Sequence, residues 1–341
     1  MRTSTGNLVG ACLVAALLAA CGNNGLSSST ATSVAPKIAA PQSVVDSTVA
    51  FGATSSKSTI YVANLGGDKV TAYNPKGKLT LTITADINGP FGVRVDKTGK
   101  IYVANTFPND FTGNVTTYTP DGKQTTPTIT AGIDFPLDVL VNKSGKIYVS
   151  NLEGPLSSGY VDRPLSFPTY SGNGSVTTYK SDGTQTTPTI TASIAGPVGL
   201  AVDASGKIYV VNLYNNTVTT YNPDGTQTTP TITTGLDNPR GIAVDANGKI
   251  YVANYLGGPS NAGSVTTYTP DGKQTTPTIT AGIVRAQGVA VDANGKIYVT
   301  NYQGPGSKGG FGSVTTYTAN GTRTTPTISK GIVVPALVTL R

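Results

Sequence analysis

The chain contains no histidine and no tryptophan, and Glu153 is its only glutamate. The missing histidine excludes every mechanism that uses a histidine base or ligand, so a general base near neutral pH would have to be a perturbed aspartate or lysine. The only two cysteines, Cys12 and Cys21, lie within the first 21 residues. A disulfide framework in the folded part of the protein is therefore excluded.

Charge is also scarce, because only 12% of the 341 residues are charged. The formal net charge is +7, but the lysines and arginines are scattered and form no run. Nucleic-acid-binding proteins cluster their basic residues and interleave them with aromatic ones. We therefore expect a mildly basic, solvated surface and no nucleic-acid partner.

The N-terminal segment is typical of a targeting signal. Arg2 precedes an apolar run, Leu8 to Ala20, which is too short for a comfortable transmembrane helix and fits a secretory signal. The run ends in Leu18-Ala19-Ala20-Cys21, which resembles the bacterial lipobox. That resemblance implies cleavage before Cys21 and lipidation of its thiol. The alternative is an ordinary signal peptide with an incidental cysteine.

These features predict three parts of the chain. Residues 1–20 are the signal peptide, and residues 21–45, rich in Ser, Thr, Ala and Pro, form a flexible tether from the lipidated Cys21. Residues 46–341 form the folded domain. We expect a lipid-anchored protein of the bacterial cell envelope. Gly22 follows the cysteine where an aspartate would resemble a retention signal, so a bacterium with two membranes would carry it on the outer one.

A repeated string organises the folded domain. Gly248 to Asn254 reads GKIYVAN; this string occurs five times nearly verbatim, and a sixth copy, Ser58 to Asn64, reads STIYVAN. Each repeat reads as four short β-strands, which we call a, b, c and d. In the last full copy they cover residues 288–292, 296–301, 313–317 and 324–329, separated by turns rich in Gly, Asn and Asp.

The repeats differ in length at one place, the loop between strands b and c. The spacings between successive copies are 41, 46, 61, 42 and 47 residues. The first five b–c loops, counted between the asparagine that ends strand b and the valine of strand c, hold 5, 9, 24, 5 and 10 residues. Subtracting each loop from its spacing leaves 36 or 37 residues every time. A fixed four-stranded unit with one variable loop is typical of a β-propeller blade.

The proline positions and the end of the chain support the same fold. A proline recurs in strand d at residues 127, 188, 230, 277 and 326. Proline has no N–H to donate and belongs on an edge strand, which strand d is in a blade. The first copy lacks a good strand a, and Leu337 to Arg341 supplies an unpaired one. We therefore predict an all-β, six-bladed propeller whose C-terminal strand completes the first blade. Residues 44–53 have no assigned role.

The repeat resembles a known family of propellers. Val-Asp-x-x-Gly-x-Ile-Tyr-Val-Ala-Asn, followed by a Val-x-x-Tyr strand and Pro-Asp-Gly, resembles NHL-type repeats over about 290 residues. Tyr298 to Asn301 also reads YVTN, the motif of related surface-protein propellers. The resemblance implies the propeller fold. It implies little about function, because propellers host many activities.

Most repeated polar residues suit structural roles. An aspartate recurs in the a–b turn, as at Asp292, where it would accept backbone N–H bonds. The asparagine that ends strand b would cap the b–c loop; a ring of six such oxygens holding a cation is the alternative. Recurrent lysines such as Lys296 would form a mild basic rim, with a role at anionic polymers as the alternative.

Binding is expected on the face formed by the b–c and d–a loops, which we call the variable face. The a–b and c–d turns form the opposite, constant face. Variable loops on a rigid scaffold are where binding usually resides. Aromatic side chains among Gly, Ser, Asn and Pro suit recognition, although they could equally pin the loops to the scaffold. The candidates on this face are Glu153, Tyr160, Asp162, Arg163, Phe167, Tyr170, Tyr214, Tyr255, Tyr302 and Phe311.

Four charged residues add to these candidates. In strand a, Arg94 replaces the Ala or Leu of the other repeats, and Asp138 replaces a Gly. They lie in adjacent blades near the axis. We expect either an ion pair in the channel or a ligand site that includes Arg240 and Arg285.

Three functions remain open from the sequence. The first is a monomeric binding scaffold for a protein, glycan or envelope partner, with no cofactor or metal. The second is a propeller hydrolase or lyase, since the repeats are similar to those of gluconolactonase-like hydrolases and streptogramin lyases. The former resemblance implies a metal site of Glu, Asn and Asp at the axis and the latter a histidine, which this chain lacks. The third, which the YVTN string favours, is a structural surface-layer or adhesive component.

Overall fold

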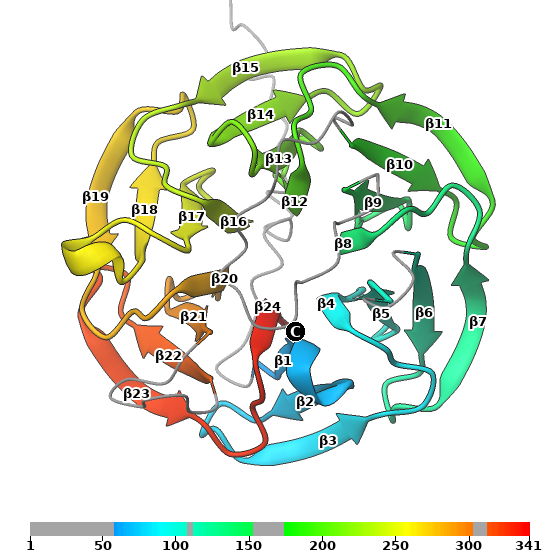
Figure 1. The fold of residues 1–341 in the computed structure, drawn as a ribbon, viewed down its shortest axis with the longest axis horizontal. Helices are drawn as coiled ribbons and strands as arrows, with labels where there is room; N and C mark the ends of the chain where they lie inside the picture. The colour runs from blue at the N-terminus through cyan, green and yellow to red at the C-terminus, as the bar shows by residue number, and fades with distance from the viewer. Residues whose placement is uncertain (1–57, 108–111, 153–173, 303–311) are drawn as a thin grey trace, which may run out of the picture. The chain divides into compact units, whose positions relative to one another are not determined.

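Residues 58–107, 112–152, 174–302 and 312–341 are described by a computed structural model. In these residues, 24 strands form six four-stranded antiparallel sheets that surround a common axis as blades (Figure 1). This is a six-bladed β-propeller, and the predicted fold is confirmed. The described helices are two short 3-10 turns, η1 (Leu65–Gly67) and η2 (Pro259–Asn261), and no helix in this part is long and apolar enough to cross a membrane.

The four strands of each blade follow the predicted order from the axis outward. Strand a, the innermost, is β4 (Pro90–Val95), β8 (Pro136–Val141), β12 (Pro197–Val202), β16 (Pro239–Val244), β20 (Ala286–Val291) and β24 (Pro335–Leu340). Strand b is β1 (Ile60–Asn64), β5 (Ile101–Asn105), β9 (Ile147–Asn151), β13 (Ile208–Asn212), β17 (Ile250–Asn254) and β21 (Ile297–Asn301). Strand c is β2 (Lys69–Tyr73), β6 (Asn114–Tyr118), β10 (Ser175–Tyr179), β14 (Thr217–Tyr221), β18 (Ser264–Tyr268) and β22 (Ser313–Tyr317). Strand d is β3 (Leu79–Ile83), β7 (Gln124–Ile129), β11 (Gln185–Ile190), β15 (Gln227–Ile232), β19 (Gln274–Ile279) and β23 (Arg323–Ile328).

Strand a begins earlier than expected in the last full repeat. Ala286 already pairs with Asn301, although the predicted strand started at Gly288. The register shifts between Ala286 and Gly288, so a bulge separates the first pair from the rest of the ladder. The prediction missed these residues because it took strand a as the short apolar run from Gly288 and left the preceding residues in the d–a loop.

The core lies between the blades, and strand b explains why its sequence is so constant. Successive side chains of a strand point to opposite faces of the sheet. Ile208 and Val210 pack toward the blade that contains β8, whereas Tyr209 and Val211 pack toward the blade that contains β16. Each strand b is fully buried on both sides in this way, so a substitution there disturbs two interfaces.

Strand d is the outer edge of each blade, and its side chains alternate between exposed and partly buried. In five of the six, all but β3, a proline removes one ladder donor. In β7 the register shifts at this point. In β6, Thr117 Oγ1 lies 2.9 Å from the carbonyl oxygen of Thr125 and 2.8 Å from that of Pro127, and donates to them. The recurrent threonine of strand c thus holds strand d through carbonyl groups of the segment in which the ladder register shifts.

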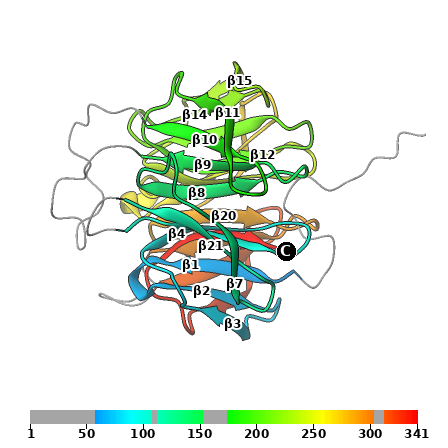
Figure 2. The same cartoon turned by 90° about the vertical axis from the view of Figure 1, so that its right-hand side faces the viewer.

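The C-terminal strand closes the ring. β24 pairs antiparallel with β1, and Ile60 lies opposite Leu340. Thr59 and Arg341 exchange backbone hydrogen bonds of 2.7 and 3.0 Å. Figure 1 shows the C-terminus beside β24 near the centre of the ring, and Figure 2 shows the strands running between the two faces. The predicted closure is confirmed, and residues 44–53 lie outside the described residues.

Candidate functional site

The six asparagines that end strand b hold the loops rather than a shared ion. In one blade, Asn254 Nδ2 donates to Thr266 Oγ1 at 3.0 Å, and Asn254 Oδ1 accepts from the backbone N–H of Asp237 at 3.1 Å. The other five asparagines make the same two contacts. Each side chain therefore ties strands b and c to the d–a loop that enters the same blade. The predicted role was to cap the b–c loop, and Asn64 makes no side-chain capping bond to the turn that follows it.

The repeated aspartates and lysines of the constant face also belong to the scaffold. Asp245 Oδ1 accepts from the backbone N–H groups of Asn247 and Lys249, at 2.8 and 3.0 Å. Lys249 Nζ donates to the carbonyl of Thr276 at 2.6 Å and lies 5.5 Å from the ring centroid of Tyr251. The lysines equivalent to Lys249 at positions 100, 146, 207 and 296 donate to the matching carbonyl.

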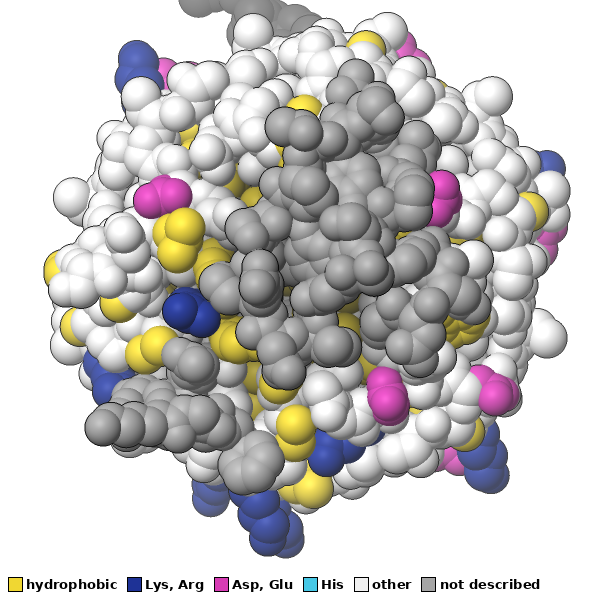
Figure 3. Space-filling model, viewed as in Figure 1, with side chains coloured by type: hydrophobic (Ala, Val, Ile, Leu, Met, Phe, Trp, Pro, Cys, Tyr) yellow, Lys and Arg dark blue, Asp and Glu magenta, His cyan; other side chains and the backbone are white. Residues whose placement is uncertain are grey.

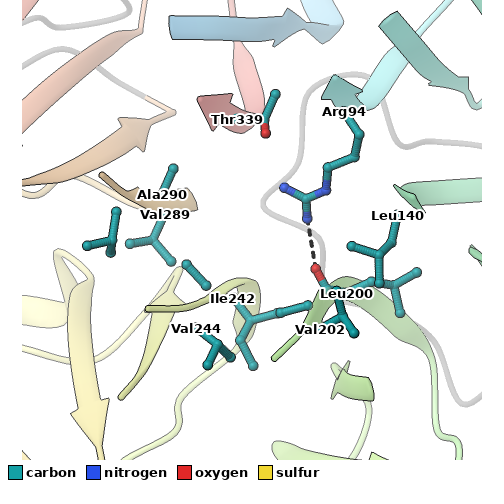
Figure 4. A pocket seen from close by; sticks show the side chains of 12 residues that line it. Arg94, Leu140, Leu200, Val202, Ile242, Val244, Val289, Ala290 and Thr339 are labelled. Atoms are coloured by element: carbon teal, nitrogen blue, oxygen red, sulfur yellow. Dashed lines mark hydrogen bonds between the residues drawn. The ribbon is translucent and has the colours of Figure 1, made fainter. Parts of the chain in front are cut away.

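Arg94 and Asp138 form an ion pair at the axis. Arg94 Nη2 lies 2.8 Å from Asp138 Oδ2 and 2.7 Å from the carbonyl oxygen of Leu200. Because the three residues belong to β4, β8 and β12, one guanidinium joins three consecutive blades. Figure 4 shows it reaching across to Leu200. Of the two alternatives from the sequence, the structure contains the ion pair.

The carboxylate of Asp138 is fully buried and well supplied with donors. Besides Arg94, it accepts from the backbone N–H groups of Val139 and Leu200, both at 2.9 Å. Burial nevertheless raises the pKa of Asp138 to about 6, because the loss of hydration outweighs the charge of Arg94 and the donated hydrogen bonds. Asp138 therefore carries its negative charge at neutral pH and becomes neutral in mild acid.

The cavity beside this pair is small. It has a volume of about 40 Å³, and its walls are apolar except for Arg94 and Thr339. This is room for roughly two or three water molecules. A sugar ring or a peptide segment does not fit, so the pair joins blades around a small cavity rather than contacting a substrate of that size.

Apolar side chains fill the axis at the end nearer the variable face. Phe91, Leu137, Val198 and Ala336 occupy the second position of strand a in four blades and form one buried cluster with Leu337. Figure 3 shows this face, and most of the charged side chains visible on it lie toward the rim. In the two remaining blades, the same strand position holds Arg240 and Gln287.

Arg240 is held from two sides and is almost completely buried, with 1% of its surface exposed. Its Nε donates to Asn238 Oδ1 at 3.1 Å, and its Nη1 donates to Gln287 Oε1 at 2.9 Å. Its guanidinium carbon lies 3.8 Å from the ring centroid of Tyr255. Its Nη2 is buried and makes no hydrogen bond to the part of the chain that the structure describes.

Arg285 and Tyr302 complete this group. Arg285 lies 5.6 Å from the ring centroid of Tyr255 and donates to the Tyr255 hydroxyl over a long 3.4 Å. Tyr302 meets Tyr255 edge to face, with 6.0 Å between ring centroids. We call Arg240, Arg285, Tyr255 and Tyr302 the arginine–tyrosine cluster. It lies on the variable face, because these residues belong to, or directly adjoin, b–c and d–a loops.

The cluster has two positive charges and, within residues 58–107, 112–152, 174–302 and 312–341, no acidic partner. Among the described residues, the ion pairs are Arg94 with Asp138, Lys123 with Asp121 and Lys273 with Asp271. The pKa of Arg240 is lowered to about 10, chiefly by burial; the two tyrosines act to raise it and the charge of Arg285 to lower it. Arg240 therefore remains a cation at neutral pH, but its burial as a charge costs stability.

The structure thus separates the four charged candidates into two pairs. Arg94 and Arg240 belong to blades on opposite sides of the ring, at the fifth and second positions of strand a. Tyr214 packs on Gly196 and the apolar cluster. Glu153, Tyr160, Asp162, Arg163, Phe167, Tyr170 and Phe311 lie outside the described residues, as does Cys21.

Two residues of the site were missed from the sequence, Asn238 and Gln287, which orient Arg240. Gln287 was detectable as a further departure from the repeat, since four other blades have an apolar residue there. Within the described part of the chain, no three His, Cys, Asp or Glu side chains gather as a metal site would require.

No family model and no curated protein sequence matches this chain. Solved β-propeller structures do. A protein of unknown function from Bacteroides caccae has a TM-score of 0.62 and 13% identity, covering 83% of this chain and 98% of that one. A putative gluconolactonase has a TM-score of 0.54 and 18% identity, covering 71% and 81%. Virginiamycin B lyase from Staphylococcus aureus has a TM-score of 0.51 and 15% identity, covering 71% and 73%. Such likeness shows the fold and assigns no activity.

Proposed function

We propose that this protein is a lipid-anchored propeller of the bacterial cell envelope, with repeats of the NHL or YVTN type, that binds a protein or glycan partner through its variable face. The lipobox-like Leu18 to Cys21 and the polar segment that follows support the anchor. Gly22 favours the outer membrane where the bacterium has two. The tether would hold the propeller off the membrane surface.

The observation that carries the binding proposal is the arginine–tyrosine cluster. A buried arginine without an acidic partner is costly, and a scaffold repeat does not require it. The four blades with apolar residues at this strand position fill the axis without any such cost. Arg240 and its supports are therefore best explained by recognition of a partner.

The division between the two faces supports the same function. The b–c loops range from 5 to 24 residues, whereas the a–b turns are short and nearly identical. A rigid ring with variation confined to one face is the usual architecture of a recognition surface.

The enzyme alternative has weaker support. The putative gluconolactonase and the lyase share the fold with this chain, but this chain has no histidine. In the strand-a segments that surround the axis, the one carboxylate is Asp138, and Arg94 and two backbone amides already engage it. Acid–base chemistry needs a group free to exchange a proton with the substrate.

A loop exchange tests the binding function. The nine residues Tyr255 to Gly263 would be replaced with Leu-Tyr-Asn-Asn, the four-residue loop that joins β13 and β14. Both proteins would be assayed on purified peptidoglycan and on an array of bacterial envelope polysaccharides and surface-protein peptides. We expect the parent to bind at least one of these and the variant to bind it at least tenfold more weakly.

The matched control changes the constant face. Ala246-Asn247-Gly248 would be replaced with Ala-Ser-Gly, the a–b turn of another blade. This variant should bind as the parent does. Equal binding by the parent and the loop-exchange variant would show that recognition does not use this part of the variable face.

A further inference from the structure

We propose that the arginine–tyrosine cluster is a binding site for a carboxylate group, with Arg240 and Arg285 as its two cationic contacts. This inference rests on the proposed binding function and names the chemistry that the variable face recognises.

The charge of the cluster favours an anion. The guanidinium groups of Arg240 and Arg285 lie 3.8 and 5.6 Å from the ring centroid of Tyr255. Neither group has an ion-pair partner among the described residues. Like charges held close together, one of them desolvated, repel each other and resist burial. A bound anion would offset both costs, whereas a cationic ligand would add to them.

The hydrogen bonds of Arg240 leave one position for that anion. Asn238 and Gln287 accept from Nε and Nη1 through neutral amide oxygens, which fix the plane of the guanidinium without neutralising it. Nη2 is buried and has no acceptor among the described residues. Buried donors are nearly always paired in native proteins, so an orphaned N–H on a fixed cation indicates the place of a ligand acceptor.

The enclosure of the site favours a carboxylate over a larger anion. Arg240 is 1% exposed and Tyr255 is 2% exposed, so only a small terminal group can approach Nη2. A carboxylate is planar, carries one charge and suits the edge of a guanidinium. A phosphate dianion would bring a second charge into a site with one fully buried cation.

Arg285 is the less enclosed of the two cationic contacts. It is half-buried, and the side-chain hydrogen bond that it donates to Tyr255 is long, at 3.4 Å. Its displacement therefore costs little, and its guanidinium is free to close on the outer oxygen of the ligand. Arg240 is the fixed contact and Arg285 the movable one.

The carboxylate could come from an acidic sugar or from an acidic side chain, and the experiment separates these sources. The mature protein would be titrated by calorimetry in low-salt buffer with glucuronate and with N-acetylglutamate whose α-carboxyl is blocked as the methylamide. Glucose and the equally blocked N-acetylglutamine methylamide are the matched uncharged probes, and sulfate is the other anion. We expect saturable binding of at least one carboxylate and none of its uncharged analogue.

Two variants locate the binding. Arg285→Gln should weaken carboxylate binding at least tenfold, and Arg240→Lys should do the same, because lysine keeps the charge but loses the planar fork. Arg323→Gln removes an exposed arginine at the start of β23 and should leave binding unchanged. If Arg240→Lys fails to fold, Arg285→Gln still decides the matter.

Three results would overturn the proposal: no saturable binding of either carboxylate, equal binding by Arg285→Gln, or sulfate binding as tightly as the carboxylates. The loop exchange distinguishes this outcome from failure of the binding function. If carboxylates do not bind but the loop exchange abolishes array binding, only the carboxylate assignment is wrong. If carboxylates bind at Arg285 but the loop exchange leaves array binding intact, the carboxylate site is correct, and the proposed function is wrong about where the partner binds.

Discussion

Arg94 Nη2 lies 2.8 Å from Asp138 Oδ2, and the two residues belong to neighbouring blades. Three other blades have alanine at the position of Arg94, and four have glycine at that of Asp138. The uncharged residues at these positions in the other blades are therefore suitable replacements for the pair. We expect Arg94→Ala and Asp138→Gly each to lower the free energy of unfolding by about 3–5 kcal/mol, because each leaves a buried charge without its partner.

The double variant Arg94→Ala/Asp138→Gly should be more stable than either single one, since it restores the uncharged repeat. Glycine fits because strands a approach closely here: a Cβ on Gly199 would lie 2.3 Å from the carbonyl oxygen of Arg240. Urea denaturation of the four proteins gives the coupling energy. Additive losses would show that the ion pair is not what the single substitutions disrupt.

The same pair predicts a pH dependence of stability. Burial raises the pKa of Asp138 to about 6 from its ordinary 3.8, so the folded protein keeps a proton that the unfolded chain releases in this interval. The contribution of Asp138 to stability is therefore largest in acid. It decreases as the pH rises through the interval between these two pKa values, by about 1.4 kcal/mol per pH unit for one proton.

The double variant isolates that contribution, because all other titrating groups are common to both proteins. The stability of the parent minus that of the double variant should fall from about pH 4 to about pH 6 and become flat above it. Urea denaturation at a series of pH values measures this difference. A difference that rises over the interval would mean that the pair holds the pKa of Asp138 below its ordinary value.

The fold was predictable because a propeller repeats a local pattern. Residues such as Ile250 to Asn254 recur with their turns, and the constant 36 or 37 residues outside each b–c loop define the blade. Ring closure was predictable because one strand a was missing at the start and one was left over at the end. The bulge at the start of strand a was not predictable, because it is set by pairing with strand b across the sheet and not by the local sequence pattern.

The site was less predictable because its contacts join different blades. Arg240 and Arg285 were identified as departures from the repeat, but sequence spacing does not show that both reach Tyr255. Gln287 holds Arg240 from the next blade, across 47 residues of sequence. In a propeller, equivalent positions of the repeat lie at the same height along the central axis. Only the structure shows which side chains at the same height contact each other.

Removal of the closing strand should abolish cooperative folding. A chain truncated after Pro335 loses most of β24 and leaves the backbone edge of β1 unpaired. It also exposes apolar residues of two blades, since Val338 and Leu340 pack with Ile60 and Tyr298. Thermal unfolding followed by circular dichroism should show a broad transition or none.

Deletion of Arg341 alone is the control for that truncation. It removes two terminal backbone hydrogen bonds and no apolar contact of β24, so we expect a cooperative transition at a slightly lower temperature. A chain truncated after Pro335 that melts like the parent would refute closure by β24.

The tyrosine of strand c gives a test of how evenly the ring is held together. Tyr118 Oη donates to the carbonyl of Ala85 in the loop from the preceding blade, at 2.7 Å, and Tyr73 Oη donates to that of Lys330 at 2.9 Å. The second bond joins the first blade to the last, and both tyrosines are fully buried. Replacement with phenylalanine removes the donor without opening a cavity and leaves a carbonyl without its partner.

We expect Tyr118→Phe and Tyr73→Phe each to lower the free energy of unfolding by about 1–2 kcal/mol, as for other hydrogen bonds lost from a buried partner. Equal losses, measured by urea denaturation, would show that the closing interface is as tightly held as an internal one. A different result is a full effect of Tyr118→Phe with a negligible effect of Tyr73→Phe. This would mean that the ring opens between the first and last blades before it unfolds. A contact that is already broken in the opened ring contributes nothing to the free energy of the unfolding step.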